Sequence, residues 1–237
     1  MKRILVLKHM PSQNPGIFRE FASDQGIEFF EIDLHAGDQI PDISQFDGLW
    51  SMGGSMDVWE EEYPWLAEEE QAIRHAVSEL EMPFFGICLG HQLLAEAMGG
   101  KVERAQEFEI GLYDVRPTPE GKGHPLMQGL ATPGTWVNVH MAEVSEPPKG
   151  AIILAESDRC KVHMMQIGEL AFSCQFHPEV GDATVDGWMG IPGIPQALAG
   201  LLGTEGLEAF KSAIANHLPS HKAAARQLLA NWCKLVF

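Results

Sequence analysis

Several features are absent from the 237-residue sequence, and each absence excludes a class of protein. No apolar run approaches the ~20 residues that cross a bilayer, and the N-terminal apolar run, which ends at Lys8, is too short for a signal peptide. Basic residues are few: 16 Lys and Arg stand against 33 Asp and Glu, for a formal net charge of −17. That charge repels phosphate backbones and anionic lipids. We expect a cytoplasmic protein that binds neither nucleic acid nor membranes.

Cysteine is also scarce. The sequence contains four cysteines: Cys88, Cys160, Cys174 and Cys233. They show no paired spacing such as C-x-x-C, and a reducing compartment would keep them as thiols. No group of His, Cys and acidic residues stands at metal-ligand spacing, and His163 alternates with apolar neighbours as a strand residue does. We therefore expect no disulfide, no metal and no cofactor.

The pattern of apolar residues predicts the fold class. With 45% apolar residues the chain can bury a substantial core, and we expect one domain over residues 1–237. In the first half, short β-rich runs alternate with helical stretches, which is typical of βαβ units around a parallel sheet. In the second half, several strands follow one another with few helices between them. We predict an α/β three-layer sandwich with a central, mostly parallel sheet, helices on both faces and an antiparallel excursion in the second half.

The individual elements follow from the same patterns. The predicted strands are residues 3–7, 27–32, 46–52, 84–87, 109–117, 135–139, 151–156, 161–167 and 170–176. Helices are predicted over 15–25, after Pro64 and from His91, and a C-terminal helical extension over about 194–237. The Gly- and Pro-rich stretch 187–195 is predicted to be a structured loop. The acidic run 59–71 is interpreted as a solvated helix face without a catalytic role.

Cys88 lies between Gly86 and Gly90, where the apolar run FFGI gives way to a helix-like pattern. A sharp strand-to-helix turn needs small neighbours of this kind, and it would hold the thiol at the carboxyl end of the strand. The free N–H groups and positive end of the following helix would favour the thiolate and could receive an oxyanion. The alternative is that Cys88 is a small, buried, apolar side chain.

A second segment supplies what a reactive thiol would need. The segment CQFHPEV ends a predicted strand with His177, a proline and Glu179. A cysteine nucleophile requires a base, and the base requires a group that fixes its tautomer and stabilises its charged form. A histidine and a carboxylate on either side of a rigid proline could provide both.

These two segments together resemble the class I glutamine amidotransferases, whose glutaminase domain carries a G-x-C-x-G elbow and a later H-P-E. GICLGHQLLAEAMGG is similar to the nucleophile segment of the family, and QFHPE is similar to its His-Glu segment. DGLWSMGGSMDV, residues 47–58, looks like the Gly-rich oxyanion loop of the family, and YPWLAEEEQAIRHA looks like the helix before the elbow. The segments EIGLYDV and HPLMQGL also have counterparts there. The resemblance extends over most of the chain and leaves out about the last 40 residues.

The resemblance implies a role for each matching position. Cys88 would attack a γ-carboxamide carbon to form a thioester, His177 would transfer protons, and Glu179 would orient the imidazole. The backbone N–H groups of Gly54 and Leu89 would hold the oxyanion, each worth about 3 kcal/mol of the barrier. The resemblance also implies positions that bind the glutamyl group: Gln92, His140 and Met141.

One histidine and one tryptophan have competing interpretations. In a rival family of cysteine hydrolases, related to intracellular proteases, a histidine next to the nucleophile is the base. Here Leu89 and Gly90 intervene before His91, so we interpret His91 as a helix-surface or packing residue, and the H-P-E segment favours the amidotransferase pattern. Trp188 and its neighbours could border the leaving-group side of the pocket, or could belong to a loop packed over the core.

Three functions remain open. The chain departs from the family pattern at Ser55, where proline is usual, and at Val139, where a small polar residue is common; both lie near the expected substrate. These departures favour a free-standing hydrolase of a γ-glutamyl amide such as a γ-glutamylated amine over hydrolysis of glutamine itself. A glutaminase subunit that passes ammonia to a separate synthetase or ligase partner is the second function, since the chain has no G-x-x-x-x-G-K-[ST] phosphate loop of its own. The third is a non-catalytic binding or regulatory module, against which the presence of Cys88, His177 and Glu179 together argues.

Overall fold

The computed structural model describes all residues 1–237. Nine strands form one mixed sheet in the order β2-β1-β3-β4-β9-β8-β7-β5-β6. The strands are β1 (Lys2–Lys8), β2 (Ile27–Asp33), β3 (Gly48–Ser51), β4 (Phe84–Ile87), β5 (Lys101–Pro117), β6 (Gly134–Glu146), β7 (Ile152–Glu156), β8 (Met164–Ile167) and β9 (Ala171–Cys174). The helices are α1 (Phe18–Ala22), α2 (Pro64–Arg74), α3 (Leu89–Ala97), α4 (Thr184–Met189) and α5 (Ile194–Val236). Single helical turns lie at Ser23–Gln25, Leu34–Ala36, Ile43–Gln45, His75–Glu79 and Pro125–Met127.

The sheet has a parallel and an antiparallel part. Strands β2, β1, β3, β4 and β9 are parallel to one another, whereas β8, β7, β5 and β6 join by antiparallel pairing. The inner parallel strands β3, β4 and β9 are short and buried, as the continuous apolar runs of the sequence predict. The predicted mixed sheet with an antiparallel excursion in the second half is therefore confirmed.

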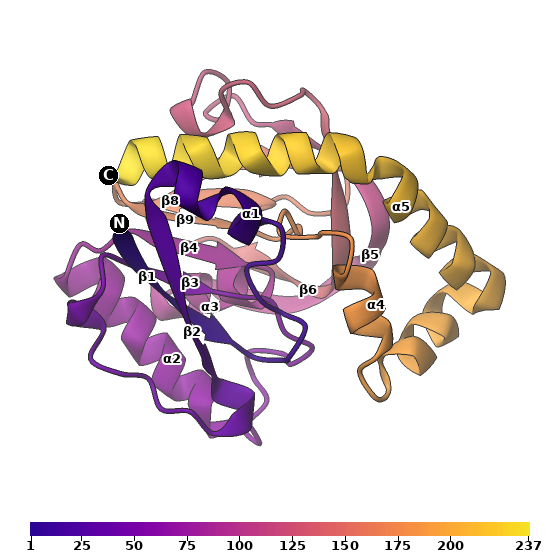
Figure 1. The fold of residues 1–237 in the computed structure, drawn as a ribbon, viewed down its shortest axis with the longest axis horizontal. Coiled ribbons are helices and arrows are strands. Elements are labelled where there is room, and N and C mark those ends of the chain that lie inside the picture. The colour runs from indigo at the N-terminus through magenta and orange to yellow at the C-terminus, as the bar shows by residue number, and fades with distance from the viewer.

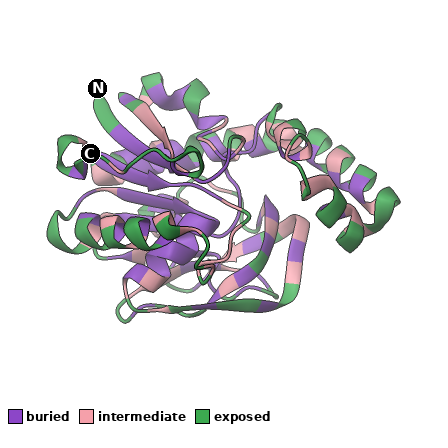
Figure 2. Ribbon diagram, turned by 90° about the horizontal axis from the view of Figure 1, so that it is seen from below, coloured by how far each residue is buried: buried purple, intermediate pink, exposed green.

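Helices cover both faces of the sheet, as Figure 1 shows. On one face α1 and the second half of α5 pack on a 26-residue core cluster that includes Trp50 and Trp232. On the other face α2 and α3 pack on a 22-residue cluster that includes Leu49 and Phe84. Residues turned toward the sheet are buried and the outer surfaces of the helices are exposed (Figure 2). The result is the predicted three-layer α/β sandwich.

Helix α5 changes direction along its length. Gly203 has non-helical dihedrals, φ 73° and ψ 165°, which separate the first turns of α5 from the rest of the helix. Pro219 lies inside the helix further on, where proline removes a backbone hydrogen bond and favours a kink. The first half of α5 extends away from the sheet together with α4 (Figures 1 and 2). It is held by a small third cluster that joins Val137 on β6 to Trp188 on α4 and Phe210 on α5. This places an apolar helix surface beside the carboxyl ends of β4 and β9.

Three local predictions are wrong. The stretch 187–195 is not a loop throughout, because α4 continues to Met189 and α5 begins at Ile194. The strand predicted from residue 109 begins at Lys101, since β5 pairs with β6 through a polar segment whose sequence lacks an apolar run. The acidic run 59–71 is not wholly solvated: Glu69, inside α2, is fully buried.

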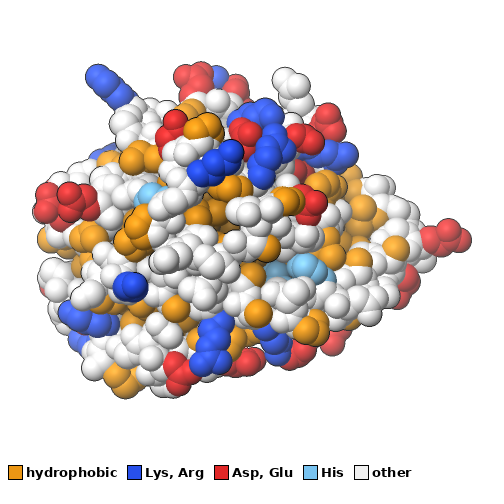
Figure 3. Space-filling view, turned by 90° about the horizontal axis from the view of Figure 1, so that it is seen from above, with side chains coloured by type: hydrophobic (Ala, Val, Ile, Leu, Met, Phe, Trp, Pro, Cys, Tyr) orange, Lys and Arg blue, Asp and Glu red, His pale blue; other side chains and the backbone are white.

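The face of the molecule that α5 covers carries charges of both signs (Figure 3). No helix is both long and apolar enough to cross a membrane. On the side covered by α5, basic side chains are interspersed with acidic and apolar ones (Figure 3). Two of the basic residues there are paired, with Lys222 Nζ 2.6 Å from Asp182 Oδ2 and Arg226 2.7 Å from Asp24 Oδ2.

Candidate active site

Cys88 occupies the sharp turn between β4 and α3. Its backbone has φ 52° and ψ −102°, a conformation that a non-glycine residue adopts only when its surroundings impose it, at a cost of about 1–3 kcal/mol. A Cβ on Gly86 would lie 2.5 Å from the carbonyl oxygen of Gly90, and a Cβ on Gly90 would overlap the carbonyl of Ser51. The prediction that both glycines make room for this turn is confirmed.

His177 and Glu179 follow β9, the strand that pairs in parallel with β4. The Cys88 N–H donates to the carbonyl of Cys174 at 2.9 Å, so the ends of the two strands stay in register. His177 Nδ1 lies 2.7 Å from Glu179 Oε1, and both side chains are buried, with 2% and 1% exposed. Cys88 and His177 line the same cleft. The structure thus brings together the three side chains that the motifs indicate.

The electrostatics of His177 favour its charged form. Burial disfavours the imidazolium, but the neighbouring Glu179 carboxylate outweighs burial and holds the pKa of His177 well above its usual 6.5. A histidine that keeps its proton beside a sulfur can both stabilise a thiolate and donate to a leaving amine.

The two residues that carry the predicted oxyanion donors, Gly54 and Leu89, lie against each other beside the turn that contains Cys88. Leu89 begins α3, where the first N–H groups of a helix have no partner within the helix. Gly54 lies against Leu89, since a Cβ on Gly54 would be 2.6 Å from Leu89 Cδ2. Neither N–H donates to a backbone acceptor. Gly54 and Cys88 line the same cleft.

The predicted glutamyl-binding residues lie in this cleft, but their polar groups are unequally free. Both His140 nitrogens face protein atoms, with Nδ1 3.1 Å from the Ala142 carbonyl and Nε2 3.0 Å from Glu109. The Gln92 amide donates to Ala142 at 3.0 Å, so only its oxygen remains available. Met141 is 40% exposed in the lining.

Gln175, the first residue of the QFHPE segment, lies near Cys88, although the sequence gives it no role. Its Nε2 lies 3.7 Å from Cys88 Sγ, and its Oε1 accepts from Gln92 Nε2 at 3.1 Å. A signal is present, because Gln175 precedes His177 by two residues, but a lone glutamine carries no distinctive chemistry.

His91 lies inside the protein and not on the helix surface. It is fully buried and its Nδ1 lies 2.8 Å from Ser173 Oγ. Burial and the neighbouring His163 lower the pKa of His91 to about 3, so the ring stays neutral. His91 does not line the cleft, which agrees with its interpretation as a packing residue.

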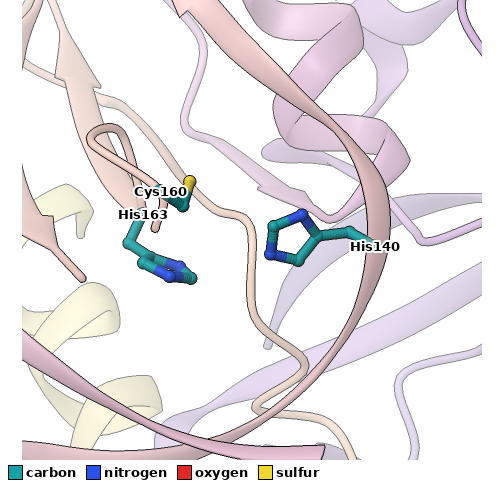
Figure 4. A group of neighbouring side chains, drawn as sticks. All are labelled: His140, Cys160 and His163. Atoms are coloured by element: carbon teal, nitrogen blue, oxygen red, sulfur yellow. The ribbon is translucent and has the colours of Figure 1, made fainter. Parts of the chain in front are cut away.

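A second group of possible ligands lies beside the cleft: His140, Cys160 and His163 have ligand atoms within 4.8 Å of one another (Figure 4). They come from β6 and from the loop before β8. Cys160 and His163 are three residues apart, but His140 lies 20 residues before Cys160, so no local motif contains all three. The Glu109 carboxylate gives both imidazoles an acidic partner, 3.0 Å from His140 Nε2 and 2.8 Å from His163 Nε2. Ser157 Oγ donates to its other oxygen at 2.7 Å. Neither ring nitrogen of His163 makes a hydrogen bond, so these contacts do not fully satisfy the group, and the absence of a metal stays a prediction.

The cleft around Cys88 is mostly apolar. Its empty space is about 890 Å³, open solvent at the mouth included, and 13 of its 20 lining residues are hydrophobic. The lining contains no Lys or Arg. On one side, the wall consists of apolar residues of α4, α5 and the turn between them: Trp188, Ile191, Ile194, Ala197, Leu198 and Leu201. The Trp188 ring also meets the His177 ring edge to face, with centroids 5.3 Å apart.

Comparison with known sequences gives consistent matches. The family model described as glutamine amidotransferase class-I matches residues 20–187. The glutamine amidotransferase-like protein YfeJ of Salmonella typhimurium is 32% identical over 193 residues, which cover 78% of this chain and 79% of that protein. A subunit of the glutamine-hydrolyzing GMP synthase of Thermococcus kodakarensis is 39% identical over 110 residues, 46% of this chain and 57% of that subunit.

Solved structures agree. A glutamine amidotransferase of Thermotoga maritima superposes with a TM-score of 0.84 at 24% identity, and 98% of each chain is covered. A glutamine amidotransferase of Methylobacillus flagellatus has a TM-score of 0.82 at 28% identity, over 99% of this chain and 95% of that one. Since the family match spans most of the sequence and the fold agrees over nearly its whole length, the protein belongs to the class I glutamine amidotransferase family.

Proposed function

We propose that the protein hydrolyses γ-glutamyl amides through a thioester on Cys88, and that its preferred substrates carry an apolar amine. In the first half of the reaction, the Cys88 sulfur attacks the γ-carbonyl carbon and a C–S bond forms. The carbonyl oxygen becomes an oxyanion between the N–H groups of Gly54 and Leu89. The C–N bond then breaks as His177 gives its proton to the leaving amine nitrogen.

The second half of the reaction releases the acid. His177, now neutral, takes a proton from water, whose oxygen attacks the thioester carbon. The C–S bond breaks as the C–O bond forms, so that glutamate leaves and Cys88 returns to its starting form. Glu179 stays charged throughout and stabilises the imidazolium at 2.7 Å.

The single observation that supports an apolar amine is the wall of the cleft beyond residue 187. Six lining residues follow the segment that the family model matches, and all six are apolar. Ammonia is small and polar and gains nothing from such a wall. An alkyl or aryl amine would bury apolar surface against it, which favours binding by about 25 cal/mol for each Å² buried. The absence of Lys and Arg from the lining likewise disfavours an amine that carries a carboxylate.

Supply of ammonia to a synthetase partner is the second candidate. It is supported by the similarity to a subunit of glutamine-hydrolyzing GMP synthases, which reaches 39% identity over 110 residues. Under this alternative the apolar surface of α4 and α5 would face the partner protein.

Glutamate release from a panel of γ-glutamyl amides separates these functions. The panel contains glutamine and the γ-glutamyl amides of ethylamine, hexylamine, aniline and a diamine. We expect the highest kcat/KM for the hexyl and aryl amides and none with Cys88→Ala. Cys233→Ala is the matched control, because Cys233 is also buried but lies on the second half of α5, outside the cleft.

Other outcomes would favour the alternatives. Turnover of glutamine alone, increased by an added synthetase, would support the ammonia-supplying function. No turnover of any amide, together with no labelling of Cys88 by a glutamine-like alkylating agent, would favour a non-catalytic binding module.

A further inference from the structure

A buried network of polar residues lies behind the predicted oxyanion loop, and the proposed reaction does not use it. His9 follows β1, Ser51 ends β3, and Glu69 lies in α2; all three are fully buried. His9 Nε2 lies 2.7 Å from Glu69 Oε2, and Ser51 Oγ donates to Glu69 Oε1 at 2.6 Å. The ring of Trp65 stacks on the His9 imidazole, with centroids 5.2 Å apart and planes 9° apart. The imidazole is therefore held at Nε2 by Glu69 and on one face by Trp65.

The free end of this network meets the loop. His9 Nδ1 lies 3.0 Å from the carbonyl oxygen of Gly53. In a trans peptide the C=O of one residue and the N–H of the next point in opposite directions. A hydrogen bond that holds the Gly53 carbonyl toward His9 therefore turns the Gly54 N–H away from His9. Gly54 lines the cleft that contains Cys88, and its N–H has no backbone acceptor.

The contact requires a proton on Nδ1. Nε2 faces a carboxylate, so it carries a proton, and a neutral ring would then point a lone pair at the Gly53 carbonyl. A charged ring has a proton on both nitrogens. Burial opposes that charge, but Glu69 outweighs burial and raises the pKa of His9. Glu69 thus supplies the counter-charge that lets His9 donate on both sides.

The loop leaves little room for another arrangement. A Cβ on Gly53 would lie 2.9 Å from Gln13 Oε1 and 3.1 Å from His177 Cε1, and a Cβ on Gly54 would lie 3.2 Å from His9 Cβ. The Gly53–Gly54 peptide is thus held between His9 on one side and His177 on the other. Its orientation depends on whether its carbonyl is attracted toward His9 or toward the cleft.

We propose that His9, held by Glu69, is a positioning residue that orients the Gly53–Gly54 peptide so that the Gly54 N–H is an oxyanion donor. This inference rests on the proposed hydrolysis of γ-glutamyl amides. His9 touches neither the substrate nor the sulfur, and it acts only through the peptide.

Two variants of the same position separate the two hydrogen bonds of His9. The amide nitrogen of asparagine can occupy the place of Nδ1, whereas that of glutamine reaches the place of Nε2. We expect His9→Gln to lower kcat about 10²–10³-fold with little change in KM, as loss of one oxyanion donor does. His9→Asn should recover most of that loss.

Alkylation of Cys88 by iodoacetamide is the readout that distinguishes positioning of the peptide from a merely structural role. This displacement forms no oxyanion, so its rate should be the same in His9→Gln and in the wild type. Three results would overturn the proposal. They are an equal loss of kcat in His9→Gln and His9→Asn, a kcat of His9→Gln within about threefold of the wild type, and a fall in the alkylation rate of His9→Gln that parallels its fall in kcat. If His9→Gln does not fold, Glu69→Gln takes its place. Its kcat is expected to lie between those of the wild type and Cys88→Ala, with an unchanged alkylation rate. A kcat equal to that of the wild type would contradict the proposal.

The inference and the proposed function can fail separately. If the wild type hydrolyses no amide, the proposed function fails, and crystal structures of the wild type and of His9→Gln then test the orientation of the peptide. A Gly53 carbonyl that points toward residue 9 in both proteins would show that His9 does not orient it.

Discussion

At the scale of the residue, position and charge give Cys88 and His177 their chemistry. Cys88 has a φ of 52° because Gly86 and Gly90 permit β4 and α3 to approach each other closely. Cys160, Cys174 and Cys233 are also buried, and burial raises the pKa of each of these thiols. A buried cysteine is inert by default. Cys160 also lies near imidazoles, those of His140 and His163, but it does not line the cleft. Cys88 differs from the other three because it lines the cleft together with His177.

The charge of Glu179 predicts the titration of His177. Burial lowers and Glu179 raises the pKa of this histidine, and the net shift is upward, so the imidazolium persists above pH 6.5 and is lost only as the pH rises through the raised pKa. Glu179→Gln removes the attraction, so the pKa of His177 should fall. An NMR titration of the His177 ring measures both values. A wild-type His177 that titrates at or below 6.5, or one that Glu179→Gln leaves unchanged, would contradict this account.

The group formed by His140, Cys160 and His163 predicts no bound metal. Glu109 places a carboxylate 3.0 Å from His140 Nε2 and 2.8 Å from His163 Nε2, and we expect it to be their partner in place of a cation. Elemental analysis of the purified protein should find substoichiometric zinc, and a chelator should change neither the melting temperature nor glutamate release. One equivalent of zinc that is lost in His163→Gln would show that the group is a metal site.

At the scale of the element, the parallel strands β4 and β9 bring distant residues together. Their register pairs Ile87 with Cys174, so the segments that follow both strands leave the same edge of the sheet. Active sites of open α/β sheets form at the carboxyl ends of strands for this reason. The Gly-rich loop after β3 reaches the same edge from the other side of β4.

At the turn between β4 and α3, Gly90 is the glycine where an added Cβ would be most crowded. A Cβ there would overlap the Ser51 carbonyl, which is backbone and cannot rotate away. Gly90→Ala should lower the free energy of unfolding by about 3 kcal/mol, measured by urea denaturation. Gly200→Ala is the control: nothing lies within 4 Å of its Cβ, and the change should be neutral or stabilise by up to about 1 kcal/mol. Equal effects of the two substitutions would show that the turn is not crowded.

The apolar side chains on the first half of α5 should make the cleft select the hexyl amide over glutamine. Leu201 lines the cleft and is 47% exposed, so Leu201→Gln should leave the fold intact. We expect kcat/KM for the hexyl amide to fall about tenfold while that for glutamine is unchanged, because only the larger amine reaches this wall. Leu80→Gln, on an exposed residue outside the cleft, is the control. A similar fall for both substrates would show that α5 does not contact the amine.

At the scale of the whole molecule, the sequence predicts the layers better than it predicts the site. Continuous apolar runs such as FFGI mark buried strands, and their order predicts the mixed sheet. Helix α4 escapes prediction because Gly187 and Gly190 resemble loop residues, and tertiary contacts of Trp188 hold it instead. The motifs around Cys88 and His177 are local in sequence and can be found. Glu69 and His9 cannot, because they lie 60 residues apart and meet only in the folded chain.

The most direct test of the account is the trapping of an acyl-enzyme. The protein is mixed with the hexyl amide, quenched in acid within one turnover, and digested for mass spectrometry. We predict that the peptide containing Cys88 gains the mass of one glutamyl group in the wild type and not in Cys88→Ala. Turnover without any adduct on Cys88, or an adduct on another residue, would contradict the central claim that this thiol forms the covalent intermediate.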